Sequence, residues 1–208
     1  MKRKSIAMTL VVVAVCGIAG ASHAGTVWDE DNSGDLSNNG LSPTSVALTT
    51  GSNTILGSMG NSDRDYFTFT VPAGTTLTSI KVLNNTFVSG GSSFMGLQAG
   101  PQVTVPTSGL NYQQILLGWT HYNSDSIDTD LLPTIMNSIN PLGSSLSSGA
   151  YSVWLNETGG LATYGFELTV TPTAAVANVA DAPLPTWAYV LLAAALLGMT
   201  FNRKLHEH

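Results

Sequence analysis

The stretch that decides the fold is Asp65-Tyr66-Phe67-Thr68-Phe69-Thr70-Val71. On an extended chain, Phe67, Phe69 and Val71 point to one side and the threonines point to the other. Residues 164–170 (Tyr-Gly-Phe-Glu-Leu-Thr-Val) repeat this pattern, with an apolar side chain at each of four alternate positions. Strict alternation of this kind is typical of a β-strand that buries one face. The two stretches therefore predict two such strands, far apart in the chain.

Further runs lie between these stretches, and they extend the prediction to the whole domain. Strands are predicted at residues 77–83, 94–99, 115–121 and 151–157. Pro72-Ala73-Gly74 and Thr158-Gly159-Gly160 supply turn chemistry, and one short helix is predicted within residues 130–139, where Pro133 suits a first turn. Several short strands without crossover helices predict an all-β fold, an antiparallel β-sandwich.

Residues 65–74 resemble the bacterial pre-peptidase C-terminal (PPC-like) domains. Residues 149–155, followed by residues 164–170, look like the closing hairpin of that family. The resemblance covers about residues 46–170, although the long middle segment 100–148 departs from the compact pattern of the family. It implies an extracellular, jelly-roll-like sandwich that serves as an accessory module without catalytic residues.

The N-terminus has the three parts of a secretory signal peptide. Three basic residues follow Met1, an apolar run occupies residues 6–18, and Ala21-Ser22-His23-Ala24 places small residues where a signal peptidase reads them. Cleavage is predicted after Ala24. The alternatives are an uncleaved N-terminal anchor and a lipoprotein attached through Cys16, which lies inside the apolar run.

The C-terminus predicts a transmembrane helix at residues 186–202. The run 188–199 is apolar on every side, Trp187 stands at its start, and Arg203 and Lys204 follow it, which is the order expected for a span with a cytoplasmic basic end. The helical part is short for a hydrocarbon core of about 30 Å. The alternative is a buried C-terminal helix of a soluble domain.

Pro183-Leu184-Pro185, followed by this helix and the basic pair, resembles the C-terminal sorting signals of the PEP-CTERM type, in an IPTL-like or VPLPA-like variant with Leu184 in place of the usual glutamate. The resemblance implies recognition by a membrane-embedded, exosortase-like enzyme and removal of the tail. It also implies an inner-membrane intermediate on the way to the cell surface or the medium.

These features predict five segments: a signal peptide (1–24), a β-sandwich (25–171), a spacer with the sorting motif (172–185), a transmembrane helix (186–202) and a basic tail (203–208). Between residues 25 and 182 the chain has two basic and twelve acidic residues, a net charge of −10. This charge argues against nucleic acid as a partner, because phosphate binding requires Lys and Arg, and it suits cations. The same part has no cysteine, and therefore no disulfide or thiolate metal site.

An acidic stretch opens the predicted mature chain. Asp29, Asp31, Ser33 and Asp35 place oxygens at alternate positions with a glycine at the sixth, like the first half of an EF-hand calcium loop. The twelfth position is Gly40 instead of a bidentate glutamate. The alternative is a solvated acidic turn.

Two other acidic groups follow. Asp63 and Asp65 flank Arg64 and are predicted to form a solvated turn. The second group consists of Asp125, Asp128 and Asp130. We expect it either to hold a cation or to be surface charge.

The case for catalysis is weak. His121 is the only histidine between residues 25 and 182, no Gly-x-Ser-x-Gly sequence accompanies it, and one His without Cys does not make a typical zinc site. We therefore predict a non-enzymatic cell-surface or extracellular-matrix protein. The alternative is a ligand-binding module for calcium or extracellular polysaccharide.

Aromatic residues are the basis of the polysaccharide alternative, because exposed rings stack on sugar faces. The competing interpretation is core packing, which a sandwich of this size needs. The residues concerned are Trp28, Trp119, Tyr122, Trp154 and Tyr164.

Overall fold

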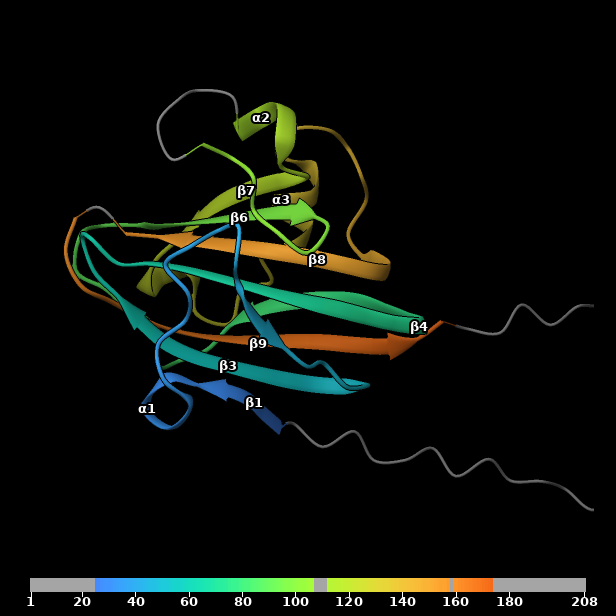
Figure 1. Cartoon of the computed structure of the whole chain (residues 1–208), viewed down its shortest axis with the longest axis horizontal. Coiled ribbons are helices and arrows are strands. Elements are labelled where there is room, and N and C mark those ends of the chain that lie inside the picture. Colours follow the sequence, from blue (N-terminus) through green and yellow to red (C-terminus); the bar gives the residue numbers. More distant parts are fainter. Residues whose placement is uncertain (1–24, 107–111, 158, 174–208) are drawn as a thin grey trace, which may run out of the picture. The chain divides into compact units, whose positions relative to one another are not determined.

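The computed structural model describes residues 25–106, 112–157 and 159–173, which are mostly β-structure with a few short helices (Figure 1). The strands are β1 (Gly25–Asp29), β2 (Thr44–Val46), β3 (Gly51–Met59), β4 (Arg64–Val82), β5 (Phe87–Val88), β6 (Ser93–Ala99), β7 (Gly118–Tyr122), β8 (Leu146–Asn156) and β9 (Ala162–Pro172). The helices are α1 (Glu30–Ser33), α2 (Tyr112–Ile115), α3 (Leu132–Asn137) and the 3-10 helix η1 (Ser124–Ser126).

The long strand β4 joins two layers of the fold. Its first half pairs with β8 and, on the other side, with β2, whereas its second half pairs with β9. The hydrogen-bonded order is β1-β3-β9-β4-β8-β6-β7, so β7, β6 and β8 lie on one side of β4 and β9, β3 and β1 on the other (Figure 1). The ring of Tyr122 on β7 meets the edge of Phe166 on β9, with centroids 5.1 Å apart. This contact shows that the strands on the two sides of β4 fold over a shared interior.

Pro72-Ala73-Gly74 does not form the predicted turn. The segment is an irregularity inside β4, where the register with β8 shifts between Val71 and Thr76 and Gly74 adopts a φ of 73°. Proline lacks a backbone donor and glycine tolerates this φ, so the two residues bend the strand without ending it. The strands predicted at residues 65–71 and 77–83 are therefore one.

The predicted closing hairpin is also wrong. β8 and β9 follow each other in the chain, but β8 pairs with β4 and β6, whereas β9 pairs with β3, β4 and β5. Consecutive strands thus lie on opposite sides of β4. The prediction of antiparallel pairing holds for the long strands, while the short strands β1 and β2 add to β3 and β4 in parallel.

The core is built from the alternating residues that the sequence indicates. Phe67, Phe69 and Val71 are buried in β4, and the predicted apolar face of β9 is buried with them. α3 packs into the core with three buried side chains and has a proline in its first turn, as predicted. The strand predicted at residues 115–121 begins only at Gly118, because Ile115 belongs to α2.

The outer face of β4 is covered at one point. Tyr66 is buried under Val103 and Val105, and Leu116 belongs to the same small apolar cluster. The loop that carries the two valines is anchored by the Val103 N–H, which donates to the Gly40 carbonyl at 2.8 Å. Alternation alone does not indicate this second cluster, because it depends on a loop far along the chain.

The signal peptide, the sorting motif and the transmembrane helix predicted at residues 186–202 lie outside the described residues. Within the described ranges, no helix is both long and apolar enough to cross a membrane.

Phe166→Ala is expected to lower the free energy of unfolding by about 3–5 kcal/mol, because it removes a fully buried ring from between the layers. Urea denaturation measures this change. The matched control is Phe87→Ala, whose ring is 59% exposed, with an expected change below about 0.5 kcal/mol. Equal losses in the two variants would contradict the assignment of Phe166 to the core.

Candidate metal centre

Three carboxylates from separate parts of the chain converge. Glu30, Asp35 and Asp65 each offer an oxygen, and these oxygens lie within 4.8 Å of one another. Glu30 opens α1, Asp35 follows that helix, and Asp65 is the second residue of β4. Asp29 caps α1 by accepting from the Asp31 N–H at 3.2 Å.

Glu30 ties the α1 segment to the sheet. Its Oε2 accepts from the Ser58 N–H of β3 at 2.7 Å, and its Oε1 accepts from the Leu36 N–H at 3.1 Å. Gly57 lies beside it, and a Cβ at this position would collide with the Tyr164 hydroxyl and the Glu30 carboxyl group. A glycine inside a strand is therefore what allows the carboxylate and the phenol to approach.

Asp65 and Tyr164 form the buried end of this group. The Tyr164 hydroxyl lies 2.7 Å from Oδ2 of Asp65 and 3.1 Å from Oε1 of Glu30. A phenol has one proton, so it donates fully to only one of these two oxygens. Asp65 is fully buried, and its Oδ1 has no hydrogen-bond partner among the described residues.

The group lacks a compensating positive charge. Arg64 and Lys81 are the basic residues of the described ranges. The Arg64 Nε donates to Asn156, and Lys81 pairs with Asp128 at 2.7 Å. Burial, together with the nearby charge of Glu30 and other carboxylates, raises the pKa of Asp65 to about 8, against the lowering effect of its hydrogen bond with Tyr164. Burial also raises the pKa of Glu30, against the lowering effect of its backbone hydrogen bonds.

This arrangement has two chemically reasonable states. In one, a proton neutralises Asp65 and the protonated carboxyl supplies a second donor. In the other, a cation replaces that proton and binds the oxygens that lack donors. All the side-chain ligands are oxygens, which suits a hard cation such as Ca²⁺.

The structure gives different roles to the four residues of the predicted calcium loop. Asp29 uses its carboxylate as the helix cap, and Asp31 and Ser33 are exposed. Asp35 is the member that lies with Glu30 and Asp65. The prediction that Asp65 belongs to a solvated turn is wrong, because the residue begins the buried row that continues with Phe67. Two features of the sequence indicate the buried position of Asp65: Gly57 inside a strand, and a tyrosine at the start of the apolar row of β9.

The second predicted acidic cluster is divided among different roles. Asp130 accepts from the N–H groups of Ile80 and Leu132 and so joins β4 to the start of α3. Asp128 pairs with Lys81, and Asp125 is exposed within η1. Across the described ranges, the group of three potential metal-ligating side chains that converges is Glu30, Asp35 and Asp65.

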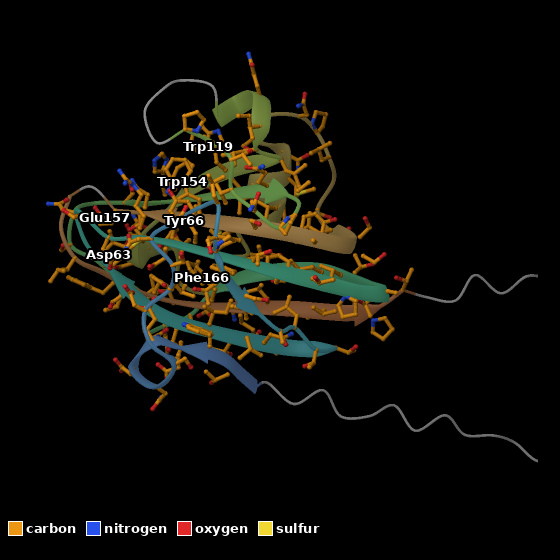
Figure 2. All side chains as sticks on the ribbon, viewed as in Figure 1. Asp63, Tyr66, Trp119, Trp154, Glu157 and Phe166 are labelled. Carbon is orange, nitrogen blue, oxygen red and sulfur yellow. The ribbon has the colours of Figure 1, made fainter. Side chains whose placement is uncertain are left out.

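Of the aromatic residues considered for polysaccharide binding, some are core residues and others lie outside the core. Tyr122 and Tyr164 are core residues, and Trp28 packs against the core from a half-buried position. Trp119 and Trp154 are half-buried on the outside of the layer formed by β6, β7 and β8. Figure 2 shows Trp119, Trp154 and Tyr66 following one another across this layer, with Phe166 in the other layer. His121 is exposed beside Trp119.

Comparisons with known proteins assign no family. No family model matches the chain, and no curated protein matches its sequence. It is similar to the crystal structure of Aeromonas hydrophila PliG, a periplasmic lysozyme inhibitor of g-type lysozyme, with 15% identity over 62% of this chain and 96% of that chain and a TM-score of 0.33. It is also similar to the pre-peptidase C-terminal domain of a Bacillus anthracis collagenase, with 17% identity over 65% of this chain and 100% of that chain and a TM-score of 0.29. At these scores neither similarity assigns an activity or a ligand.

The protonation of Asp65 predicts how stability depends on pH in the presence of a chelator. Because its pKa is about 8 when folded and near 3.8 when unfolded, the folded chain holds an extra proton between these values. The free energy of unfolding should therefore fall as pH rises from about 4 to about 8, by up to ~1.4 kcal/mol per pH unit. Urea unfolding at several pH values measures the slope, which Asp65→Asn should reduce by about one proton. Identical slopes in the two proteins would show that Asp65 does not titrate this way.

Proposed function

We propose that this chain is an exported, non-enzymatic β-domain protein that binds calcium through Glu30, Asp35 and Asp65. The observation that carries the proposal is the buried Asp65 carboxyl, whose Oδ1 is unpaired and which has two further carboxylates beside it. A buried charge without a partner costs several kcal/mol, so a cation at this point would stabilise the fold.

Calcium fits better than zinc or copper, because the converging side chains offer oxygen only. Calcium takes six to eight oxygen ligands and accepts water and carbonyl oxygens in irregular geometry, so three carboxylates form a sufficient protein contribution. The expected affinity is that of extracellular calcium modules, a dissociation constant of about 0.1–1 mM. Bound calcium would fasten the α1 segment to β3 and β4.

Calcium at about 100 times its dissociation constant is expected to add ~2.7 kcal/mol of stability, which raises the melting temperature by roughly 5–10 °C. Thermal unfolding with calcium and with a chelator measures this. The shift should disappear in Asp35→Asn and Asp65→Asn and persist in Asp31→Asn, which removes an exposed carboxylate from the same segment.

Two results would contradict the proposed site. A chain whose melting temperature does not respond to about 10 mM calcium has no such site. Loss of the shift in Asp31→Asn but not in Asp65→Asn would place calcium in the loop of Asp29, Asp31, Ser33 and Asp35 instead.

We also propose that the chain reaches the cell surface or the medium through its two ends. The apolar run after Met1 and the small residues before Ala24 support export, and Pro183, Leu184, Pro185, Arg203 and Lys204 support C-terminal sorting by an exosortase-like enzyme. Sorting of this kind passes through an inner-membrane intermediate.

The intact mass of the protein from fractionated native cells and medium tests this route. The mass expected for the released product begins after Ala24 and ends near Pro183–Pro185. A product that still includes His208 and stays in the inner membrane would show that the tail is a permanent anchor.

A further inference from the structure

The three carboxylates of the candidate metal centre run from the core to the surface. Asp65 is fully buried, Glu30 is half-buried and Asp35 is exposed. The helix that Glu30 opens, α1, lies at the outer margin of the layer that contains β3 (Figure 1). An ion held by these carboxylates would therefore be enclosed by protein on the side of Asp65 and open to solvent on the side of Asp35.

The described residues supply only part of the oxygen ligands that calcium requires. Glu30 already accepts from the N–H groups of Ser58 and Leu36. Oδ2 of Asp65 lies 2.7 Å from the Tyr164 hydroxyl. Each of the three carboxylates offers one oxygen to the shared point, whereas calcium takes six to eight. About half or more of the coordination positions are thus left for other oxygens, and they face the open side.

Negative charge borders this open side. Burial and the nearby charge of Asp63 raise the pKa of Asp35, and Asp31 is exposed on α1. Asn38 fixes Asp63, because its Nδ2 donates to Oδ1 of Asp63 at 3.0 Å while its own Oδ1 accepts from the Arg64 N–H at 2.7 Å. Three carboxylates exceed the charge of one Ca²⁺, so the loaded site stays negative.

A sugar hydroxyl suits these open positions better than an anion does. Its oxygen has two lone pairs for the ion, and its O–H proton can be donated to a carboxylate. An ionised carboxylate or phosphate ligand has no such proton, and it would face the charges of Asp35 and Asp63. Two hydroxyls on neighbouring carbons can replace two waters on one ion while only one molecule loses its freedom of movement.

The charge of the whole domain restricts the ligand in the same way. Residues 25–182 have a net charge of −10, which repels anionic polymers and anionic membrane surfaces. A cationic polymer would compete with calcium for the same carboxylates. The open side also faces the medium, so it can accept one residue within a long chain. These conditions favour a neutral polymer of sugars.

We propose that calcium bound by Glu30, Asp35 and Asp65 holds a neutral polysaccharide through two hydroxyls on neighbouring carbons. This inference rests on the proposed calcium site and assigns a ligand to it. The two hydroxyl oxygens bind the ion, and a hydroxyl proton is donated to Asp35 or Asp63. Because calcium and the polymer bind together, each raises the affinity of the protein for the other by the same factor.

Native electrophoresis in gels that contain galactomannan or dextran tests the proposal, with either calcium or a chelator in the gel. In calcium, at least one of these neutral polymers should retard the protein, and the chelator should abolish the retardation. The matched ligand control is the same polymer after periodate oxidation and borohydride reduction, which removes pairs of neighbouring hydroxyls. This control and dextran sulfate, the anionic comparison, should not retard the protein.

Variants of the protein connect retardation to the metal centre. Asp35→Asn should lose both the retardation and the calcium-dependent rise in melting temperature, whereas Asp31→Asn, which removes an exposed carboxylate from the same segment, should keep both. A saturating concentration of the polymer should lower the apparent dissociation constant of calcium by about fivefold or more. Melting curves of the same samples confirm that each variant is folded.

The outcomes separate this inference from the calcium proposal. A protein that calcium stabilises but that no neutral polymer retards would overturn the inference and leave the calcium site in place. A melting temperature that does not respond to calcium would overturn both. Retardation that persists in the chelator, or that is equal in the oxidised polymer, would overturn the inference, because the ligand would then bind elsewhere. Stronger retardation by dextran sulfate would also overturn it.

Discussion

The strand β4 is the constraint on which the rest of the structure depends. Its first half belongs to one layer and its second half to the other, and its alternating residues separate two environments. Asp65, Phe67 and Phe69 point inward, whereas Arg64 and Tyr66 point outward. The inner row starts at a carboxylate and the outer row starts at a guanidinium, so one strand contributes to both the candidate metal centre and the small apolar cluster on the outer face.

The carboxylate at the start of the inner row is buried without a compensating positive charge. Asp65 is as well buried as the phenylalanines that follow it, but it carries a group that water or a cation would normally stabilise. Tyr164 supplies one donor to two carboxylates, and the backbone N–H groups of Ser58 and Leu36 donate to Glu30 only. A proton would meet the remaining demand, and so would the proposed calcium ion, so we expect stability to depend on pH and on calcium.

Much of the β-structure is predictable from local patterns, and the failures have a common cause. The strands at residues 94–99, 151–157 and 164–170 were recognisable because their apolar residues alternate with small or polar ones. β3 was not, because Gly51, Asn53 and Gly57 interrupt its apolar pattern; Asn53 is nevertheless fully buried, with its amide bonded to the backbone. Partner choice between strands failed too, since the pairing of β8 and β9 with β4 depends on contacts between residues far apart in the chain.

The sequence by itself determined the all-β class, the inward face of β4 and the acidity of residues 25–182, because these follow from residue type and periodicity. The tertiary structure alone decided which carboxylates meet. Glu30, Asp35 and Asp65 come from a short helix, a loop and a strand, and Gly57 and Tyr164 complete their surroundings from two other strands. The same holds for the rings on the outer face, because strand register sets Trp119, Phe94 and Trp154 beside one another, and no single stretch of sequence specifies that register.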